Sequence, residues 1–134
     1  MFKERRHLAI FSPDLLTKVL QGEKKVDVRL SERAIPPYQA IHRNDRILIK
    51  KSGGKVFGEA KVSNVLFYDR LNPAKVKKIK RKYNKEIRAD ESFWQKKRKA
   101  KYATVIFLNS VKRYLGPINF TKHDRRAWVV LGKK

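Results

Sequence analysis

Apolar and polar residues alternate along much of the chain with the period of a β-strand. In residues 25–30 every second position is apolar, which predicts a half-exposed strand with Asp27 and Arg29 together on its polar face. A strand with a bend at Gly58 is expected within a longer β-branched run. That run is residues 56–67, and short apolar segments predict further strands at 7–11, 46–50, 102–111 and 127–131.

Helices are expected where a capping side chain precedes apolar residues spaced three or four apart. Ser12 predicts the start of a helix over residues 13–21, which Gly22 closes in a left-handed conformation. Asn72 opens a lysine-rich helix, and Asp90 caps a further short helix. Irregular connections are expected at 34–40 and 117–124. About six strands with helices at the periphery predict an α+β barrel.

Length and composition fit a single domain over residues 1–134, since 41% of the residues are hydrophobic and one core can be buried. The chain has no cysteine, which excludes disulfides, thiolate metal sites and a cysteine nucleophile, and it favours a cytoplasmic location. Its three histidines, at positions 7, 42 and 123, have no metal-ligand spacing. We therefore expect no metal and no cofactor.

The charge narrows the choice of partner. Lys and Arg number 35 against 12 Asp and Glu, and a net charge of +23 exceeds what solubility requires, so the partner is expected to be a polyanion. No apolar run approaches the roughly 20 residues of a membrane span, and the first one ends at Phe11, too early for a signal peptide. The basic helix offers only Val76 and Ile79 to a membrane surface, which disfavours a lipid partner. Nucleic acid is therefore the expected polyanionic partner.

Residues 22–29 read Gly-Glu-Lys-Lys-Val-Asp-Val-Arg, follow a predicted helix and enter a predicted strand. This segment resembles the G-x-K-x-x-[ED]-x-R signature of the ASCH domain, a member of the PUA-like superfamily. Asn44-Asp45 resembles the G-D turn of that family, and residues 58–62 resemble its G-x-[AV]-x-V strand. An aromatic helix before residues 101–106 also fits. The ordered matches cover residues 7–131.

The resemblance implies a PUA-like, partly open β-barrel with a cleft lined by Lys24, Asp27 and Arg29, and RNA or a modified nucleobase as ligand. In that cleft Arg29 would fork onto a phosphate, Asp27 would accept a base N–H, and Lys24 would neutralise a phosphate. From the spacing alone, Asp27 and Arg29 could equally form an exposed ion pair of little consequence. RNA is the expected partner, although charge alone does not exclude DNA.

The lysine-rich helix is almost free of acids between Lys75 and Lys85, so either it is a solvated surface or a polyanion lies against it. Tyr102 is a core residue or a base-stacking platform, Tyr38 is a comparable stacking candidate, and Trp128 is expected in the core. The predicted nucleic-acid-binding residues are Lys24, Lys25, Asp27, Arg29, Arg43, Lys75, Lys78, Arg81, Lys82, Lys101 and Tyr102.

Whether the chain is an enzyme stays open at this point. Ribonucleases that resemble it would use Lys24, Asp27 and Arg29 as acid, base and oxyanion stabiliser without a metal. Relatives that are amidohydrolases of N4-acylated cytidine imply Lys24 and Glu86 as catalytic groups, with Asp27 standing where those relatives have Thr. Binding without catalysis needs only the charge, the cleft and hydrogen-bonding groups. The oligomeric state does not follow from the sequence.

Overall fold

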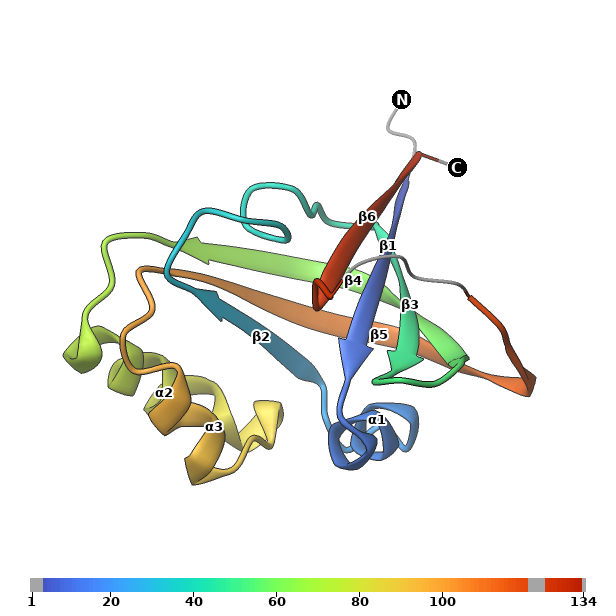
Figure 1. Cartoon of the computed structure of the whole chain (residues 1–134), viewed down its shortest axis with the longest axis horizontal. Helices are drawn as coiled ribbons and strands as arrows, with labels where there is room; N and C mark the ends of the chain where they lie inside the picture. Colours follow the sequence, from blue (N-terminus) through green and yellow to red (C-terminus); the bar gives the residue numbers. More distant parts are fainter. Residues whose placement is uncertain (1–3, 121–124, 134) are drawn as a thin grey trace.

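The computed structural model describes residues 4–120 and 125–133, and Figure 1 shows their fold. Within these ranges one six-stranded sheet has the order β2-β5-β4-β3-β1-β6, with three helices around it. The strands are β1 (Arg5–Phe11), β2 (Val26–Ser31), β3 (Arg46–Lys51), β4 (Val56–Tyr68), β5 (Tyr102–Ile118) and β6 (Trp128–Lys133). The helices are α1 (Pro13–Leu20), α2 (Pro73–Ile87) and α3 (Glu91–Lys96). The predicted α+β fold, a partly open barrel of about six strands with peripheral helices, is confirmed.

The sheet is curled. Neighbouring strands pair antiparallel except β1 with β3, which are parallel. The long pair β4 and β5 carries three register shifts, the first of them between Val56 and Gly58, and such bulges bend a strand. A Cβ on Gly58 would lie 2.4 Å from the carbonyl oxygen of Lys112, so only glycine fits at the predicted bend. Because of the curl, β1, β3 and β6 run steeply across β2, β4 and β5 (Figure 1).

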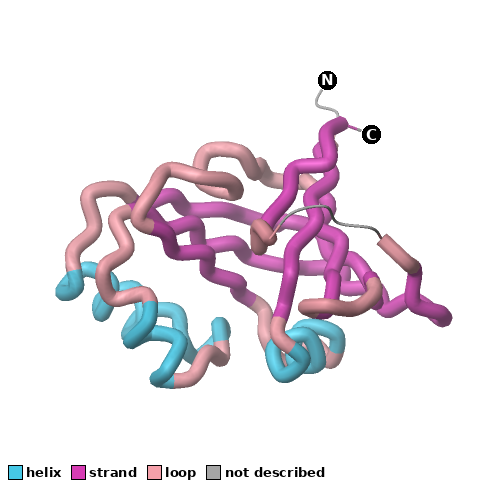
Figure 2. The backbone as a smooth tube through the Cα atoms, viewed as in Figure 1, coloured by secondary structure: helices cyan, strands magenta, loops and turns pink. Residues whose placement is uncertain are grey.

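Two hydrophobic clusters lie on different parts of the sheet. In the first, α2 and α3 pack against β2 and β5, with Val28, Ile79 and Trp94 among its members. In the second, α1 packs against β1, β3 and β4, and Trp128 is buried here as predicted. Figure 2 shows α2 and α3 together at one end of the sheet and α1 apart from them. No helix in residues 4–120 or 125–133 is long and apolar enough to cross a membrane.

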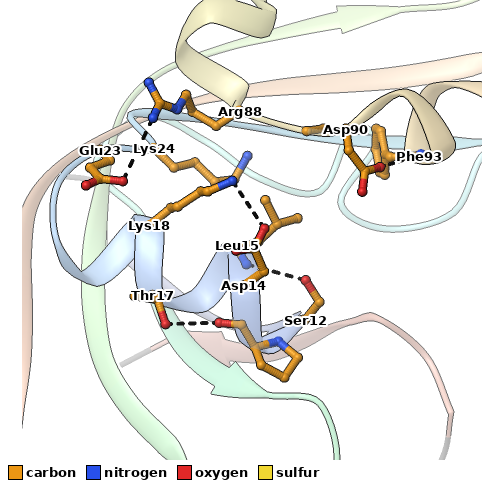
Figure 3. Close-up of polar contacts among 12 residues, drawn as sticks. Ser12, Asp14, Leu15, Thr17, Lys18, Glu23, Lys24, Arg88, Asp90 and Phe93 are labelled. Carbon is orange, nitrogen blue, oxygen red and sulfur yellow. Dashed lines mark hydrogen bonds and ion pairs between the residues drawn. The ribbon is translucent and has the colours of Figure 1, made fainter.

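The helices begin at the residues that the sequence indicates. The Ser12 hydroxyl accepts the backbone N–H of Leu15 at 3.4 Å, and Gly22 has a φ of 78° just after α1 (Figure 3). The side chains of Asn72 and Asp90 cap α2 and α3 in the same way, each at 2.9 Å. Strand β5, however, continues through residues 117 and 118, which were predicted to be loop. The predicted loop residues 121–124 lie outside the described part of the chain.

Strand β2 departs from the prediction of a half-exposed strand, because both of its faces are covered. Val26 and Val28 face the cluster under α2, as the alternation predicts. On the other face Asp27 is only 4% exposed and the Arg29 side chain 16%. The end of β1 and the start of β6 fold over this second face, since Phe11 and Trp128 both contact Arg29. The polar face of β2 is therefore one wall of a pocket.

Candidate functional site

A pocket of about 670 Å³ lies on the Asp27 and Arg29 face of β2. Its walls come from β1, β2, β6, α3 and the connection between β2 and β3, so segments far apart in the sequence meet there. The walls are mostly apolar and include four aromatic side chains: Phe11, Tyr38, Phe93 and Trp128. Cationic side chains at the same walls are Arg29, Lys97 and Arg126.

Arg29 is held firmly at this wall. Its Nε donates to Asp27 Oδ2 at 2.7 Å, and one terminal nitrogen donates to the carbonyl oxygen of Ala127 at 3.4 Å. Its guanidinium lies 4.9 Å from the Phe11 ring centre and 5.1 Å from that of Trp128, both within cation–π range. Because an arginine carries five N–H donors, three remain for an acceptor in the pocket.

Asp27 orients Arg29 and is itself held by two cations. One carboxylate oxygen accepts from Arg29, and the other lies 3.4 Å from Lys24 Nζ. Burial raises the pKa of Asp27, but the charges of Arg29 and Lys24 outweigh burial and hold that pKa below its usual value. The carboxylate is therefore ionised, and the ion pair inferred from spacing exists but is buried, not exposed.

Lys24 lies beneath this wall, outside the pocket lining, and is 1% exposed. Its amine donates to the carbonyl oxygens of Val26 at 2.8 Å and Ile87 at 2.7 Å. Ile87 is the last residue of α2, so Lys24 satisfies a carbonyl that the helix leaves unpaired. The predicted contact between Lys24 and a phosphate, or a catalytic attack by its amine, is not available in this arrangement, because protein atoms surround the amine.

The environment still changes the chemistry of Lys24. Burial lowers the pKa of this amine from 10.5 to about 8, against the opposing effect of Asp27. A lowered pKa is typical of a reactive lysine, but it is also what a buried structural lysine shows. Glu86, the predicted partner in an amidohydrolase, does not line the pocket either. Of the residues named in the two enzyme hypotheses, Asp27 and Arg29 line the pocket, and Lys24 and Glu86 do not.

Thr104 supplies an unpaired polar group to the pocket. It lies opposite Arg29 in the pairing of β2 with β5 and lines the pocket. The side chain is 1% exposed, and its hydroxyl has no hydrogen-bond partner among residues 4–120 and 125–133. A buried hydroxyl without a partner costs free energy, so a ligand that bonds to it recovers that cost.

Behind the pocket, a buried chain of hydrogen bonds holds Trp128. The indole N–H donates to His7 Nδ1 at 3.0 Å, and His7 Nε2 lies 2.9 Å from Asp45 Oδ2. Since the indole can only donate, the His7 proton is on Nε2 and is donated to Asp45. Burial lowers the pKa of His7 and outweighs the hydrogen bond and charge of Asp45, which favour the charged form. His7 is therefore neutral near pH 7.

The other predicted binding residues lie outside the pocket. Tyr102 is half-buried and contacts Tyr38 edge to face, with ring centres 4.9 Å apart. The remaining ones are exposed cations on α2 or in loops: Lys25, Arg43, Lys75, Lys78, Arg81, Lys82 and Lys101. The structure therefore groups the predicted residues into a pocket set and a separate surface set.

Sequence reasoning missed several pocket residues, among them Thr104, Lys97 and Trp128. Thr104 reads as one more β-branched residue of a buried strand, and Lys97 as one of a run of cations after α3. Trp128 was predicted in the core, where it is, but its ring also forms a pocket wall. The pairing of Thr104 with Arg29 is the signal that identifies the first of them, and it requires the strand order. Among the described residues no cluster of His, Asp and Glu could hold a metal ion.

Comparison with known proteins identifies the fold. No family model matches the sequence, and no curated protein does. Among solved structures, ASCH from Zymomonas mobilis superposes with a TM-score of 0.73 at 19% identity, covering 94% of this chain and 87% of that one. A serine-to-alanine variant of it gives 0.75 at 20% identity, covering 97% and 91%. The N-terminal domain of Staphylothermus marinus McrB gives 0.53 at 15% identity, covering 87% and 77%.

Proposed function

We propose that this chain, which has the fold of an ASCH domain, binds RNA by taking one unpaired nucleotide into the pocket beside Arg29. The observation that carries the proposal is the fixed guanidinium of Arg29, held by Asp27 and two aromatic rings at the wall of an aromatic pocket. The resemblance of residues 22–29 to the ASCH signature supports RNA over DNA.

The dimensions of the pocket suit one nucleotide. Its volume of about 670 Å³ is within the range of about 300–1,000 Å³ that is usual for small-ligand sites. Aromatic walls favour a flat base, and stacking contributes about 1–3 kcal/mol per base. A paired base is already stacked in a duplex, so the pocket selects an unpaired or extruded nucleotide.

The charges support a phosphate-bearing ligand. Arg29, Lys97 and Arg126 line the pocket, and among the described lining residues the one carboxylate, Asp27, is engaged by Arg29 and Lys24. With a net charge of +23 on the chain, polyanions are attracted from a distance and the local cations fix the phosphate. We assign the direct contact to Arg29 and a positioning role to Asp27.

The position of Lys24 favours binding over catalysis. Both enzyme hypotheses need its amine at the ligand, whereas here the amine is bonded to two backbone carbonyls and lies outside the pocket lining. A ribonuclease or amidohydrolase reaction would first require these contacts to break. The proposed function therefore needs no chemical step.

The test measures fluorescence anisotropy with a labelled single-stranded RNA, the same sequence as a blunt RNA duplex, and the matching DNA strand. We expect the single-stranded RNA to bind most tightly and to be recovered intact on a gel. Arg29→Lys keeps the charge but loses the planar fork, so it should weaken binding of the single strand about tenfold or more. The control is Arg33→Lys, an exposed arginine four residues further along, which should change nothing.

Equal affinity of wild type and Arg29→Lys for the single strand would contradict the proposal. So would equal affinity of the wild type for single-stranded and duplex RNA. Cleavage of the RNA by the wild type that is lost in Lys24→Met would instead revive the ribonuclease hypothesis.

A further inference from the structure

The exposed face of α2 carries a row of cations. Lys78, Arg81, Lys82 and Lys85 follow the spacing i, i+3, i+4 and i+7, so they share one face of the helix, and all four are exposed. The buried residues of α2 lie on the opposite face and pack against β2: Val76, Ile79, Tyr83 and Ile87. The row therefore points away from the core.

The charges of this row are not neutralised by the protein. In the part of the chain that the structure describes, no carboxylate forms a salt bridge with any of the four; on α2 only Lys80 has one, with Glu91. By contrast, α1 has Asp14 in its first turn, which pairs with Lys18 one turn later at 3.1 Å (Figure 3). Helix α2 has no acid in its first turn, so the N-terminal end of its dipole is not compensated by a carboxylate there.

The row is separate from the pocket. None of its four residues lines the pocket, and β2 lies between them. Val26 and Val28 on one face of β2 pack in the cluster under α2, whereas Asp27 and Arg29 on the other face line the pocket. Figures 1 and 2 show α2 beside β2 and away from β1 and β6, which supply other pocket walls.

We propose that the face formed by Lys78, Arg81, Lys82 and Lys85 is a second RNA-binding surface, independent of the pocket, that holds the phosphate backbone of a duplex segment without reading its sequence. This rests on the proposed function only in naming RNA as the polyanion. From Lys78 to Lys85 the helix rises about 10 Å, over which a nucleic-acid duplex carries about six phosphate charges. Each of the four cations, none of which forms a salt bridge with a carboxylate in the described part of the chain, can therefore face a phosphate. Lysine and arginine without carboxylate partners are suited to such sequence-independent contacts.

The test uses a blunt RNA duplex with no unpaired nucleotide, so that the pocket has no base to take. Its binding is measured at several salt concentrations for wild type and for the variant Lys78→Gln, Arg81→Gln, Lys82→Gln and Lys85→Gln. The matched control removes three lysines and one arginine from exposed positions elsewhere: Lys55→Gln, Lys61→Gln, Lys112→Gln and Arg113→Gln. Both variants change the net charge by the same amount.

We expect the α2 variant to lose at least tenfold in affinity for the duplex. The slope of log affinity against log salt should fall by about 3 to 4, since each of the four lost phosphate contacts contributes about 0.9. The control variant should keep the slope within about one unit of wild type. The thermal midpoint without RNA should be unchanged or higher in the α2 variant, because like charges one turn apart have been removed.

Equal slopes for the two variants would overturn the proposal, since the effect would then be one of total charge. A third measurement uses vesicles containing phosphatidylserine. If the α2 variant keeps the wild-type salt slope for RNA but no longer binds these vesicles, the surface binds a membrane, and this result also overturns the proposal. The proposed function is judged separately, because Arg29→Lys is expected to leave binding of the blunt duplex unchanged. If the α2 variant binds the duplex like wild type while Arg29→Lys still weakens binding of the single strand, only the second surface has failed. The reverse result means that only the pocket proposal has failed.

Discussion

The guanidinium of Arg29 lies 5.1 Å from the ring centre of Trp128, and this contact joins β2 to β6, about a hundred residues further along the chain. The Trp128 ring is fixed in turn by the hydrogen bond from its indole to His7. A ligand bound by Arg29 therefore meets a side chain whose position depends on both the second strand and the last described one.

Trp128→Phe separates the two roles of the indole, whose ring packs against Arg29 and whose N–H donates to His7. Phenylalanine keeps an aromatic ring against Arg29 but leaves His7 Nδ1 buried without a donor, which should lower the free energy of unfolding by about 1–3 kcal/mol. The affinity for single-stranded RNA should fall less than about threefold, because a ring still faces the guanidinium. Urea denaturation and anisotropy measure the two effects. Unchanged stability would show that the indole N–H does not contribute through His7.

Thr104→Val removes a hydroxyl without changing the shape of the side chain. Because that hydroxyl is buried without a partner in the described part of the chain, its removal should leave stability unchanged or raise it by about 1 kcal/mol. If a bound base uses the hydroxyl, affinity for single-stranded RNA should fall about fivefold to tenfold, near 1 kcal/mol. Thr104→Ser, which keeps the hydroxyl, is the control and should bind within about twofold of wild type. Loss of stability in Thr104→Val would contradict the assignment.

Lys24→Met tests whether this lysine is structural. The change leaves the carbonyl oxygens of Val26 and Ile87 unpaired and Asp27 with one cation fewer, which should cost about 3 kcal/mol of stability. At a temperature where the variant is folded, single-stranded RNA should still bind within about threefold, since Arg29 remains in place. The neighbouring exposed residue provides the control, because Lys25→Met should not affect stability. Equal stability of both variants would argue against the buried role.

His7 gives the stability a dependence on pH. Burial holds its pKa below the ordinary value of 6.5, so on acidification the unfolded chain takes up this proton before the folded protein does. Stability from His7 is therefore fully present above pH 6.5 and is lost as the pH falls below that value. Urea midpoints between pH 8 and pH 5 measure the loss, and His7→Gln should flatten it. The exposed His42, which also lies near Asp45, is the control: His42→Gln should keep the wild-type profile.

Local pattern was enough to predict most of the fold. The period-two alternation in residues 25–30 places Val26 and Val28 on the core face, and short polar side chains mark the start of each helix. These features depend on neighbours within a few residues. The length of β5 was underestimated because its outer end, near residues 117 and 118, is held by pairing with β4 and carries few apolar residues.

The site could be predicted only in part. The ASCH-like motif identified Asp27 and Arg29, but not that Lys24 between the helix and the strand turns inward to the end of α2. Burial of the polar face of β2 depends on Phe11 and Trp128, which reach Arg29 from β1 and β6. No spacing rule relates such positions before the strand order is known.

The pairing of β1 with β6 also constrains the timing of pocket formation during synthesis. His7 and Phe11 leave the ribosome early, but they cannot be joined by Trp128 until more than a hundred further residues have been added. A nascent chain that stops before β6 lacks the Trp128 wall of the pocket and exposes part of the second hydrophobic cluster. The pocket is therefore completed late in translation, whereas the cationic face of α2 depends on none of these residues.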